Sequence, residues 1–253
     1  MVDQRQAFGT SSASHAQTKE FDAGLRAYML SVYNYMASGV LLTGIVALMT
    51  SQSPAMLQTL FQLAPYGDSF AIVGYTGLGW IALLSPFAFI LAMNFGLNKM
   101  SSSTLKMVFF AFAATMGLSL SSVLLMYTGD SVVRVFFITS AAFGALSLYG
   151  YTTKKSLSGM RTFLMMGLFG IIIASVVNMF MQSTAMQFII SVVGVLVFAG
   201  LTAYDTQKIK EMYFQVSHNG EIAAKTAIMG ATSLYLDFVN LFLMLLRLMG
   251  DRR

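Results

Sequence analysis

Two aspartates lie inside apolar stretches of the chain. Asp205 stands near the end of GVLVFAGLTAYDTQ, residues 194–207, and Asp237 stands within AIMGATSLYLDFVNLFLMLL, residues 227–246. An ionised carboxylate at the centre of a bilayer costs about 2.5–3.5 kcal/mol even on a lenient insertion scale. Chains keep such residues where they face a partner, a proton or a cation inside a helix bundle. The chemistry of this protein is therefore sought first at these two residues.

Uncharged polar side chains flank both aspartates and would form a small polar island between two helices: Tyr204, Gln207, Ser233 and Asn240. Ser233 (i−4) and Asn240 (i+3) share a helix face with Asp237. Gln207 and Asn240 can donate hydrogen bonds to a carboxylate without bringing charge. These four residues are the candidate supporting groups of the site.

A close approach of the two carboxyl groups would couple them through a proton. Two carboxylates at hydrogen-bonding distance cannot both be ionised cheaply, so they share one proton. Its loss makes the groups repel or admits a cation, and calcium prefers several oxygen ligands. The pair predicts a proton-gated constriction, in which Asp205 and Asp237 form a weak, transient calcium site and no cofactor is needed.

Each aspartate also has a purely structural interpretation. Asp205 lies one turn before Lys208, so a salt bridge to Lys208 or Lys210, or a helix cap, would explain it alone. Asp237 lies about 10 residues into its segment, roughly 15 Å along a helix. Hydrogen bonds from neighbouring Tyr, Ser or Asn side chains would account for its burial. The sequence leaves both interpretations open.

Other chemistry finds little support in the sequence. The chain has no cysteine, and its two histidines, His15 and His218, lack metal-ligand spacing to Cys, Asp or Glu. Neither an H-E-x-x-H motif nor a G-x-x-x-x-G-K-[ST] phosphate loop is present. We therefore expect a protein that is not an enzyme, with no catalytic residue.

The composition is typical of a polytopic membrane protein. Of the 253 residues, 57% are hydrophobic and 10% are charged, with a mean hydropathy of +0.71, whereas soluble domains carry about 25% charged residues. The net charge of +5 fits basic loops beside one leaflet better than nucleic-acid binding. The expected partners are the lipid bilayer, calcium and protons, and no nucleic acid.

Seven apolar segments are long enough to span a bilayer: about residues 27–49, 71–95, 105–127, 132–151, 161–181, 185–207 and 227–249. An alternating strand pattern is absent, which predicts an all-α membrane protein of about seven helices. The polar residues 1–24 predict a disordered cytoplasmic tail rather than a signal peptide. Residues 25–250 form the predicted transmembrane domain.

Basic residues alternate between successive loops and predict a cytoplasmic N-terminus. With that orientation, 11 of the 15 Lys and Arg residues lie inside: Arg5, Lys19, Arg26, Lys99, Lys106, Lys154, Lys155, Arg161, Lys208, Lys210 and Lys225. A complete seventh crossing, however, would put Arg247, Arg252 and Arg253 outside, against the rule. A re-entrant last helix would keep them inside, and the sequence does not decide between the two.

The stretches GLTAYDTQKIK and SLYLDFVNLFLMLLRLMG resemble the C-terminal signature of the Bax inhibitor (TMBIM) family. LSPFAFILAMNFGLNKMSSSTLKMVFFAFAATMGLSLSS is similar to the second and third spans of that family, and VRVFFITSAAFGALSLYGYTTKKSLSGM to the fourth span and following loop. The resemblance covers about residues 25–250. The tail, basic loops and N-in topology resemble a bacterial inner-membrane member.

The resemblance implies a seven-helix fold with the last helix at its centre, and a pH-sensitive calcium leak controlled by a di-aspartyl sensor at Asp205 and Asp237. In some members a basic residue after the second span latches to the first aspartate. Here only Lys99 stands near that position, and lysine lacks the bidentate fork of arginine, so a weaker latch is expected. Some bacterial relatives are associated with modulating a membrane-bound ATP-dependent protease, which gives the alternative function of a non-channel regulator.

Overall fold

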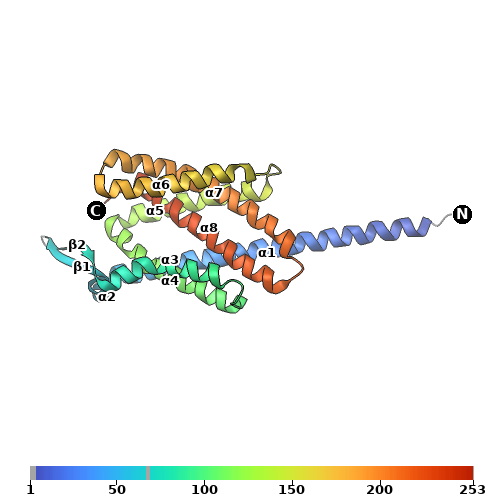
Figure 1. Cartoon of the computed structure of the whole chain (residues 1–253), viewed down its shortest axis with the longest axis horizontal. Helices are drawn as coiled ribbons and strands as arrows, with labels where there is room; N and C mark the ends of the chain where they lie inside the picture. The colour runs from blue at the N-terminus through green and yellow to red at the C-terminus, as the bar shows by residue number, and fades with distance from the viewer. Residues whose placement is uncertain (1–3, 67–68, 253) are drawn as a thin grey trace.

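The computed structural model describes the backbone of residues 4–66 and 69–252 and the side chains of residues 22–64 and 72–252. The chain is 87% helical, and its elements are α1 (Gln4–Gln52), α2 (Pro54–Leu60), β1 (Phe61–Tyr66), β2 (Ser69–Tyr75), α3 (Gly77–Gly96), α4 (Ser102–Met126), α5 (Gly129–Thr152), a 3-10 turn (Ser158–Met160), α6 (Arg161–Met181), α7 (Thr184–Val216) and α8 (Gly220–Met249). Figure 1 shows the long helices packed in a bundle, with the two termini at opposite ends.

Short polar side chains set the starts of the helices. Ser101, Thr128, Ser183 and Asn219 each accept a hydrogen bond from the backbone N–H three residues later. These side chains satisfy donors that an α-helix leaves unpaired at its first turn. The helix boundaries are therefore encoded locally, in the connections between the apolar segments.

Within the described residues, seven helices have the length and hydropathy to cross a membrane: Asp22–Gln52, Gly77–Gly96, Ser102–Met126, Gly129–Thr152, Ser158–Met181, Thr184–Val216 and Gly220–Met249. They correspond one to one with the seven predicted segments, so the all-α membrane fold is confirmed. Helix α7 has 33 residues, about 50 Å at 1.5 Å per residue. It is longer than the roughly 30 Å hydrocarbon core.

The second predicted span was wrong over its first six residues. Residues 69–75 form β2, which pairs antiparallel with β1 from Phe61↔Tyr75 to Tyr66↔Ser69. The Phe61 and Tyr75 rings lie 5.4 Å apart, and Tyr75 also contacts Trp80 at the start of α3. A short apolar run does not distinguish a strand from a helix by periodicity alone. This hairpin also corrects the prediction that strand patterning is absent.

The predicted tail is helical from Gln4 onward. Helix α1 continues from residue 4 into the apolar span that begins at Asp22. Figure 1 shows its first turns projecting beyond the other helices at the N-terminal end of the bundle. Residues 4–21, part of the tail predicted to be disordered, thus extend the helix of the first span.

Helix α8 is the central element of the bundle. Of its most apolar stretch, 61% is buried, against 11–33% in the other six spans. It packs against α1, α4, α5 and α7, and Tyr235 is fully buried against Phe109 and Phe112 of α4. The helix runs unbroken over 30 residues to the end of the bundle opposite the N-terminus (Figure 1). Its length and course favour a complete crossing over a re-entrant last helix.

Polar contacts hold both ends of α8. At its start, the Glu221 carboxylate accepts hydrogen bonds of 2.7 Å from the backbone N–H and the hydroxyl of Ser102 on α4. Just past its end, Asp251 Oδ2 accepts from Ser131 Oγ at 2.9 Å and Arg134 Nη2 at 3.0 Å on α5. The Ser131 hydroxyl and the Arg134 guanidinium hold the pKa of the Asp251 carboxyl below its usual range. The central helix is thereby fixed in register with α4 and α5.

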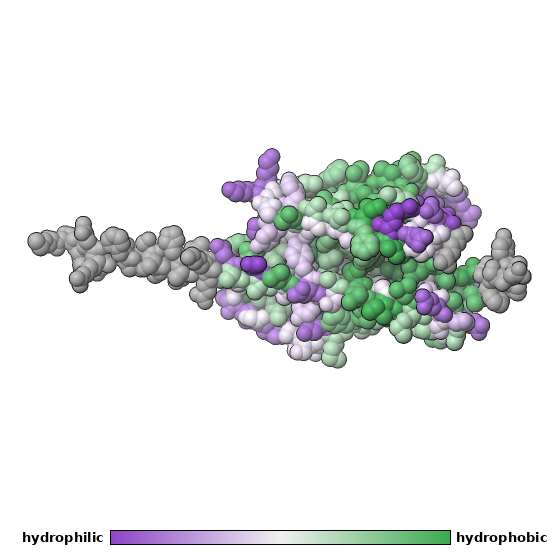
Figure 2. Space-filling model, turned by 180° about the vertical axis from the view of Figure 1, so that it is seen from behind, coloured by the Kyte–Doolittle hydropathy of each residue, from purple (hydrophilic) through white to green (hydrophobic). Residues whose placement is uncertain are grey.

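The outer surface matches a lipid environment. Figure 2 shows apolar side chains over the middle of the bundle and polar ones toward both ends. Helix α6 is the least buried span, with Phe163 and Phe180 72% and 79% exposed. Exposure of large apolar residues on this scale is expected where lipid, not water, covers the helices.

Gly150 on α5 tests the close packing beside Asp205. A Cβ at this position would collide with the backbone carbonyl of Ala203 on α7. We expect Gly150→Ala to force the two helices apart and to destabilise the fold by about 1–3 kcal/mol. The measurement is the thermal unfolding midpoint of the purified protein in detergent. Gly144→Ala is the matched control, because a Cβ at Gly144 on the same helix meets nothing within 4 Å; equal midpoints for the two variants would contradict the packing argument.

Candidate functional site

The two intramembrane aspartates meet in the fold. Asp205 on α7 and Asp237 on α8 lie within hydrogen-bonding reach of each other's carboxyl groups. The helices are antiparallel neighbours joined by the short turn at residues 217–219. Two carboxyl groups can form a hydrogen bond only if one of them carries a proton. The close approach that the sequence required for proton sharing is therefore present.

Asp237 is the more deeply buried partner. Asp237 is 5% exposed, whereas Asp205 is half-buried. Among the described residues, Asp237 Oδ2 is shielded from solvent and has no hydrogen-bond partner. Such an atom is uncommon in a folded protein, because an unpaired buried acceptor costs about 1–3 kcal/mol. The expected hydrogen bonds from Tyr, Ser or Asn therefore do not satisfy this oxygen.

Lys208 and Arg161 are the basic residues whose positive charges act on Asp205, and both side chains are exposed. Neither forms an ion pair with Asp205 among the described side chains. Lys210 is directed elsewhere: its Nζ donates to Tyr151 O at 2.7 Å and lies 5.1 Å from the centroid of the Tyr151 ring. The salt-bridge explanation of Asp205 is therefore wrong for Lys210, and Lys208 acts only at longer range.

Lys99 does not latch to Asp205 in this structure. It is exposed in the turn after α3 and forms no ion pair with any described side chain. The physical reason is topological, because α3 packs on α4, whereas α7 packs on α5, α6 and α8. The positive charges that do act on Asp205 are those of Lys208 on α7 and, more weakly, Arg161 at the start of α6.

The amides expected to support the pair bind backbone groups instead. Gln207 Oε1 accepts from Leu157 N at 2.7 Å, and its Nε2 donates to Lys155 O at 2.9 Å. Asn240 Nδ2 donates to Leu236 O at 2.8 Å, within its own helix. Buried backbone groups in a loop require partners, and Gln207 supplies them to the α5–α6 connection. It is a positioning residue for that loop rather than a donor to the carboxyl pair.

The two remaining candidates lie on the helices that carry the pair. Tyr204 packs among apolar residues of α6, α7 and α8, and Ser233 is half-buried on α8. No hydrogen bond from either side chain to the carboxyl groups is present among the described contacts. Of the six residues proposed around the pair, only Lys208 interacts with it, and only through its charge.

A chain of hydroxyl groups that sequence reasoning missed fixes α7 beside Asp205. Tyr33 Oη on α1 lies 2.7 Å from Ser147 Oγ on α5, which lies 2.9 Å from Thr206 Oγ1. Ser147 and Thr206 are buried. A single hydroxyl in an apolar segment is common and does not suggest a partner. Tyr33 and Ser147 are 114 residues apart in sequence. No local signal could have connected them.

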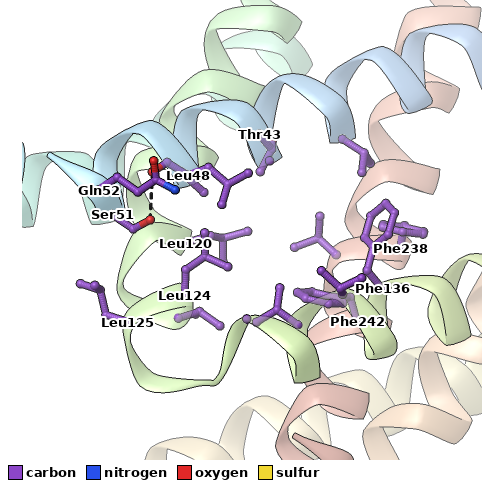
Figure 3. Close-up of a pocket in the computed structure, with 18 residues that line it drawn as sticks. Thr43, Leu48, Ser51, Gln52, Leu120, Leu124, Leu125, Phe136, Phe238 and Phe242 are labelled. Carbon is purple, nitrogen blue, oxygen red and sulfur yellow. Dashed lines mark hydrogen bonds between the residues drawn. The ribbon is translucent and has the colours of Figure 1, made fainter. Parts of the chain in front are cut away.

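A cavity of about 410 Å³ opens near the far ends of α1 and α4, on the side of the bundle away from the N-terminus. Figure 3 shows Phe136, Phe238 and Phe242 on one side of it and Ser51 and Gln52 on the other. Its lining is largely apolar and includes Phe238 and Val239, but not Asp237. The cavity therefore reaches α8 at the residue after Asp237 and includes neither aspartate.

Aromatic rings fill the space beside Asp237. The Phe238 ring lies 5.5 Å from Phe143 and 5.7 Å from Phe136, both on α5 and both edge-on. Two residues before Asp237, Tyr235 Oη lies 2.7 Å from Thr43 Oγ1. The Thr43 hydroxyl in turn donates a hydrogen bond to Ala113 O. These contacts close the packing of α1, α4, α5 and α8 around the central helix.

The pair alone offers few ligands for a resident metal ion. Within the described residues, no group of three His, Cys, Asp or Glu side chains is placed to hold one. Asp205 and Asp237 would need backbone carbonyls or water to complete a calcium shell of six to eight oxygens. Such a donor set suits an ion that passes rather than one that stays.

Comparison with known proteins identifies the family of this chain. A family model described as inhibitor of apoptosis-promoting Bax1 matches residues 25–253. The Rickettsia prowazekii protein RP147 is 44% identical over 253 residues, which is the whole of both chains. The inner membrane protein YbhL of Escherichia coli K12 is 41% identical over 232 residues, covering 91% of this chain and 94% of YbhL. A protein of Caulobacter vibrioides is 40% identical along the full length of both.

The matched region includes all seven spans and both aspartates of the pair. The chain therefore belongs to the Bax inhibitor family of membrane proteins.

Proposed function

We propose that this protein is a pH-sensitive calcium leak channel, gated by a proton that Asp205 and Asp237 share. The observation that carries the proposal is the direct approach of these two carboxyl groups between α7 and α8. Asp237 lies on α8, the most buried helix of the bundle, where helix packing alone does not require an acid. The role requires no catalytic residue and no cofactor.

The gate depends on the repulsion that follows loss of the proton. With the proton in place, a hydrogen bond joins α7 to α8. Without it, two like charges about 4 Å apart repel by about 4 kcal/mol at an effective dielectric constant of 20. A difference of that size shifts a closed–open equilibrium by roughly three powers of ten. Separation of the two helices would then open the bundle beside Asp237.

Calcium is the cation that the site favours once it is ionised. Two carboxylates supply hard oxygen ligands and a charge of opposite sign, and Asp237 Oδ2 keeps its acceptor capacity free. The cavity next to Phe238 gives the ion a route from the other side of the membrane. The rings of Phe136 and Phe143 pack against Phe238, the cavity-lining residue that follows Asp237 in sequence.

We place the protein in the bacterial inner membrane with its N-terminus in the cytoplasm. The connections at the N-terminal end of the bundle carry most of the basic residues, among them Lys99, Lys154 and Lys155. Basic loops favour the cytoplasmic side. The name of the E. coli relative assigns that protein to the inner membrane.

Calcium flux against pH tests the gate. Purified protein in liposomes that enclose a calcium-sensitive dye should leak more calcium as the pH rises from about 6 to 8, because the shared proton is lost over that range. The expected change is about tenfold, which corresponds to about 1.4 kcal/mol of repulsion reaching the gate. In the double variant Asp205→Asn, Asp237→Asn, neither residue can ionise, and the flux should be independent of pH.

Asp130→Asn is the matched control for this experiment, since Asp130 lies in the first turn of α5 at the opposite end of the bundle. Its pH profile should equal that of the wild type. A double variant that keeps the wild-type profile would contradict the mechanism. Absence of flux from folded wild-type protein at every pH would contradict the channel itself.

The second candidate function is a non-channel regulator that binds a membrane-bound ATP-dependent protease or another membrane complex. The observation that favours it is the projection of α1 beyond the bundle at the N-terminal end (Figure 1). A polar segment held clear of the membrane is accessible to a partner on that side. This role is compatible with a leak, because the segment lies outside the spans.

Removal of residues 2–20 separates the two functions. A regulator should lose capture of its protease partner in pull-down from solubilised membranes, while calcium flux in liposomes stays unchanged. The control replaces residues 2–20 by a Gly/Ser segment of equal length and should also lose capture. Full capture by both altered chains would exclude the N-terminal segment as the binding site.

A further inference from the structure

A second cavity, of about 340 Å³, lies at the C-terminal end of the bundle, away from the carboxyl pair. The ends of α4, α6, α7 and α8 enclose it together with the residues after α8. Its polar lining residues are Tyr127, Ser175, Asn178, Gln187, Arg247 and Arg252. Two of the arginines that oppose the charge rule for the last helix, Arg247 and Arg252, therefore line one cavity.

Two guanidinium groups border this cavity, and within the part of the chain that the structure describes neither has an acidic partner. Arg247 lies in the last turn of α8, and Arg252 follows the helix. Neither forms an ion pair among the described side chains, and no acid is among the described residues that line the cavity. Asp251, which stands between them in sequence, is turned toward Ser131 and Arg134.

Arg252, although exposed, contacts Tyr127 through both its side chain and its backbone. Its guanidinium lies 5.9 Å from the centroid of the buried Tyr127 ring, and its backbone forms a bridge with the same residue. Arg247 alone could serve the negative end of the α8 dipole. Arg252 lies beyond the helix and has no such role, so two arginines facing one cavity indicate an anion.

Amide groups add uncharged donors to the cavity. Asn178 Oδ1 accepts a hydrogen bond of 3.0 Å from Ser183 N, which leaves its Nδ2 group as a donor. Gln187 lies in the first turn of α7, where the partial positive charge of a 33-residue helix is located. Guanidinium and amide donors around one space match the oxygens of a phosphate.

The surroundings of the cavity select a lipid over a free anion. It lies where the spans end, which is the level of the head groups of a bilayer. On α6 and α7 beside it, Met179, Phe180 and Phe188 are 66%, 79% and 62% exposed. An anionic phospholipid can place its phosphate between the arginines and its acyl chains against these apolar side chains.

We propose that this cavity binds the phosphodiester head group of an anionic phospholipid from the leaflet opposite the N-terminus. The bound lipid neutralises Arg247 and Arg252 and joins the ends of α4, α6, α7 and α8. The site does not depend on Asp205 or Asp237. It also accounts for positive charge at the end of the last helix, on the side where the charge rule disfavours it.

Lipid retention measured by native mass spectrometry tests this site. Protein in detergent is titrated with dioleoylphosphatidylglycerol, and separately with the zwitterionic dioleoylphosphatidylcholine. The wild type should retain one phosphatidylglycerol in preference to phosphatidylcholine. The double variant Arg247→Gln, Arg252→Gln should bind it at least about tenfold more weakly, because the charge-assisted hydrogen bonds to the phosphate are lost.

The control variant Lys154→Gln, Lys155→Gln removes the same charge at the opposite end of the bundle and should bind as the wild type does. Circular dichroism of each variant shows whether it is folded, and competition by inorganic phosphate on the wild type needs no variant. Equal retention of phosphatidylglycerol by the arginine variant and the wild type overturns the proposal. Equal affinity for phosphatidylcholine, or displacement of the lipid by millimolar phosphate, overturns the assignment to an anionic lipid.

Discussion

The contact between the Asp205 and Asp237 carboxyl groups is the interaction on which the account of this protein depends. It places two acids against each other on α7 and α8, within a bundle that otherwise buries apolar side chains and hydroxyl groups. Such a contact persists only if a proton reduces the repulsion. The surrounding fold serves to hold it: Gly150 lets α5 approach Ala203 on α7, and polar contacts fix both ends of α8.

Much of the fold could be predicted from the sequence, because a bilayer imposes length and hydropathy on each span. That constraint predicts all seven helices. The high cost of a carboxylate within a span then selects Asp205 and Asp237 as candidate functional residues. The hairpin at residues 61–75 could not be predicted, since its apolar run fits a helix equally well. Whether the last helix crosses completely could not be predicted, because Arg247 and Arg252 oppose the charge rule; its burial among four other helices favours a complete crossing.

The supporting residues were predicted less well, for a physical reason. Proximity in sequence selected Gln207 and Asn240 as donors to the carboxyl groups, but nearby backbone carbonyls and N–H groups compete for the same amides. Lys99 follows α3, which packs on α4 and not on α7, and this arrangement is visible only in the fold. The connection of Tyr33, Ser147 and Thr206 is likewise a property of three helices together. Spacing along one helix predicts shared faces, whereas partners across helices need the fold.

The central claim is that the closed pair holds one proton that leaves near neutral pH. Infrared difference spectroscopy of the purified protein measures it most directly, through the carbonyl stretch of a buried protonated carboxyl group as the pH is raised from about 6 to 8. The account predicts one such band, which disappears over this range in the wild type and is altered in both Asp205→Asn and Asp237→Asn. A wild-type protein with no buried protonated carboxyl at the lower pH, or with a band that neither substitution changes, would contradict it.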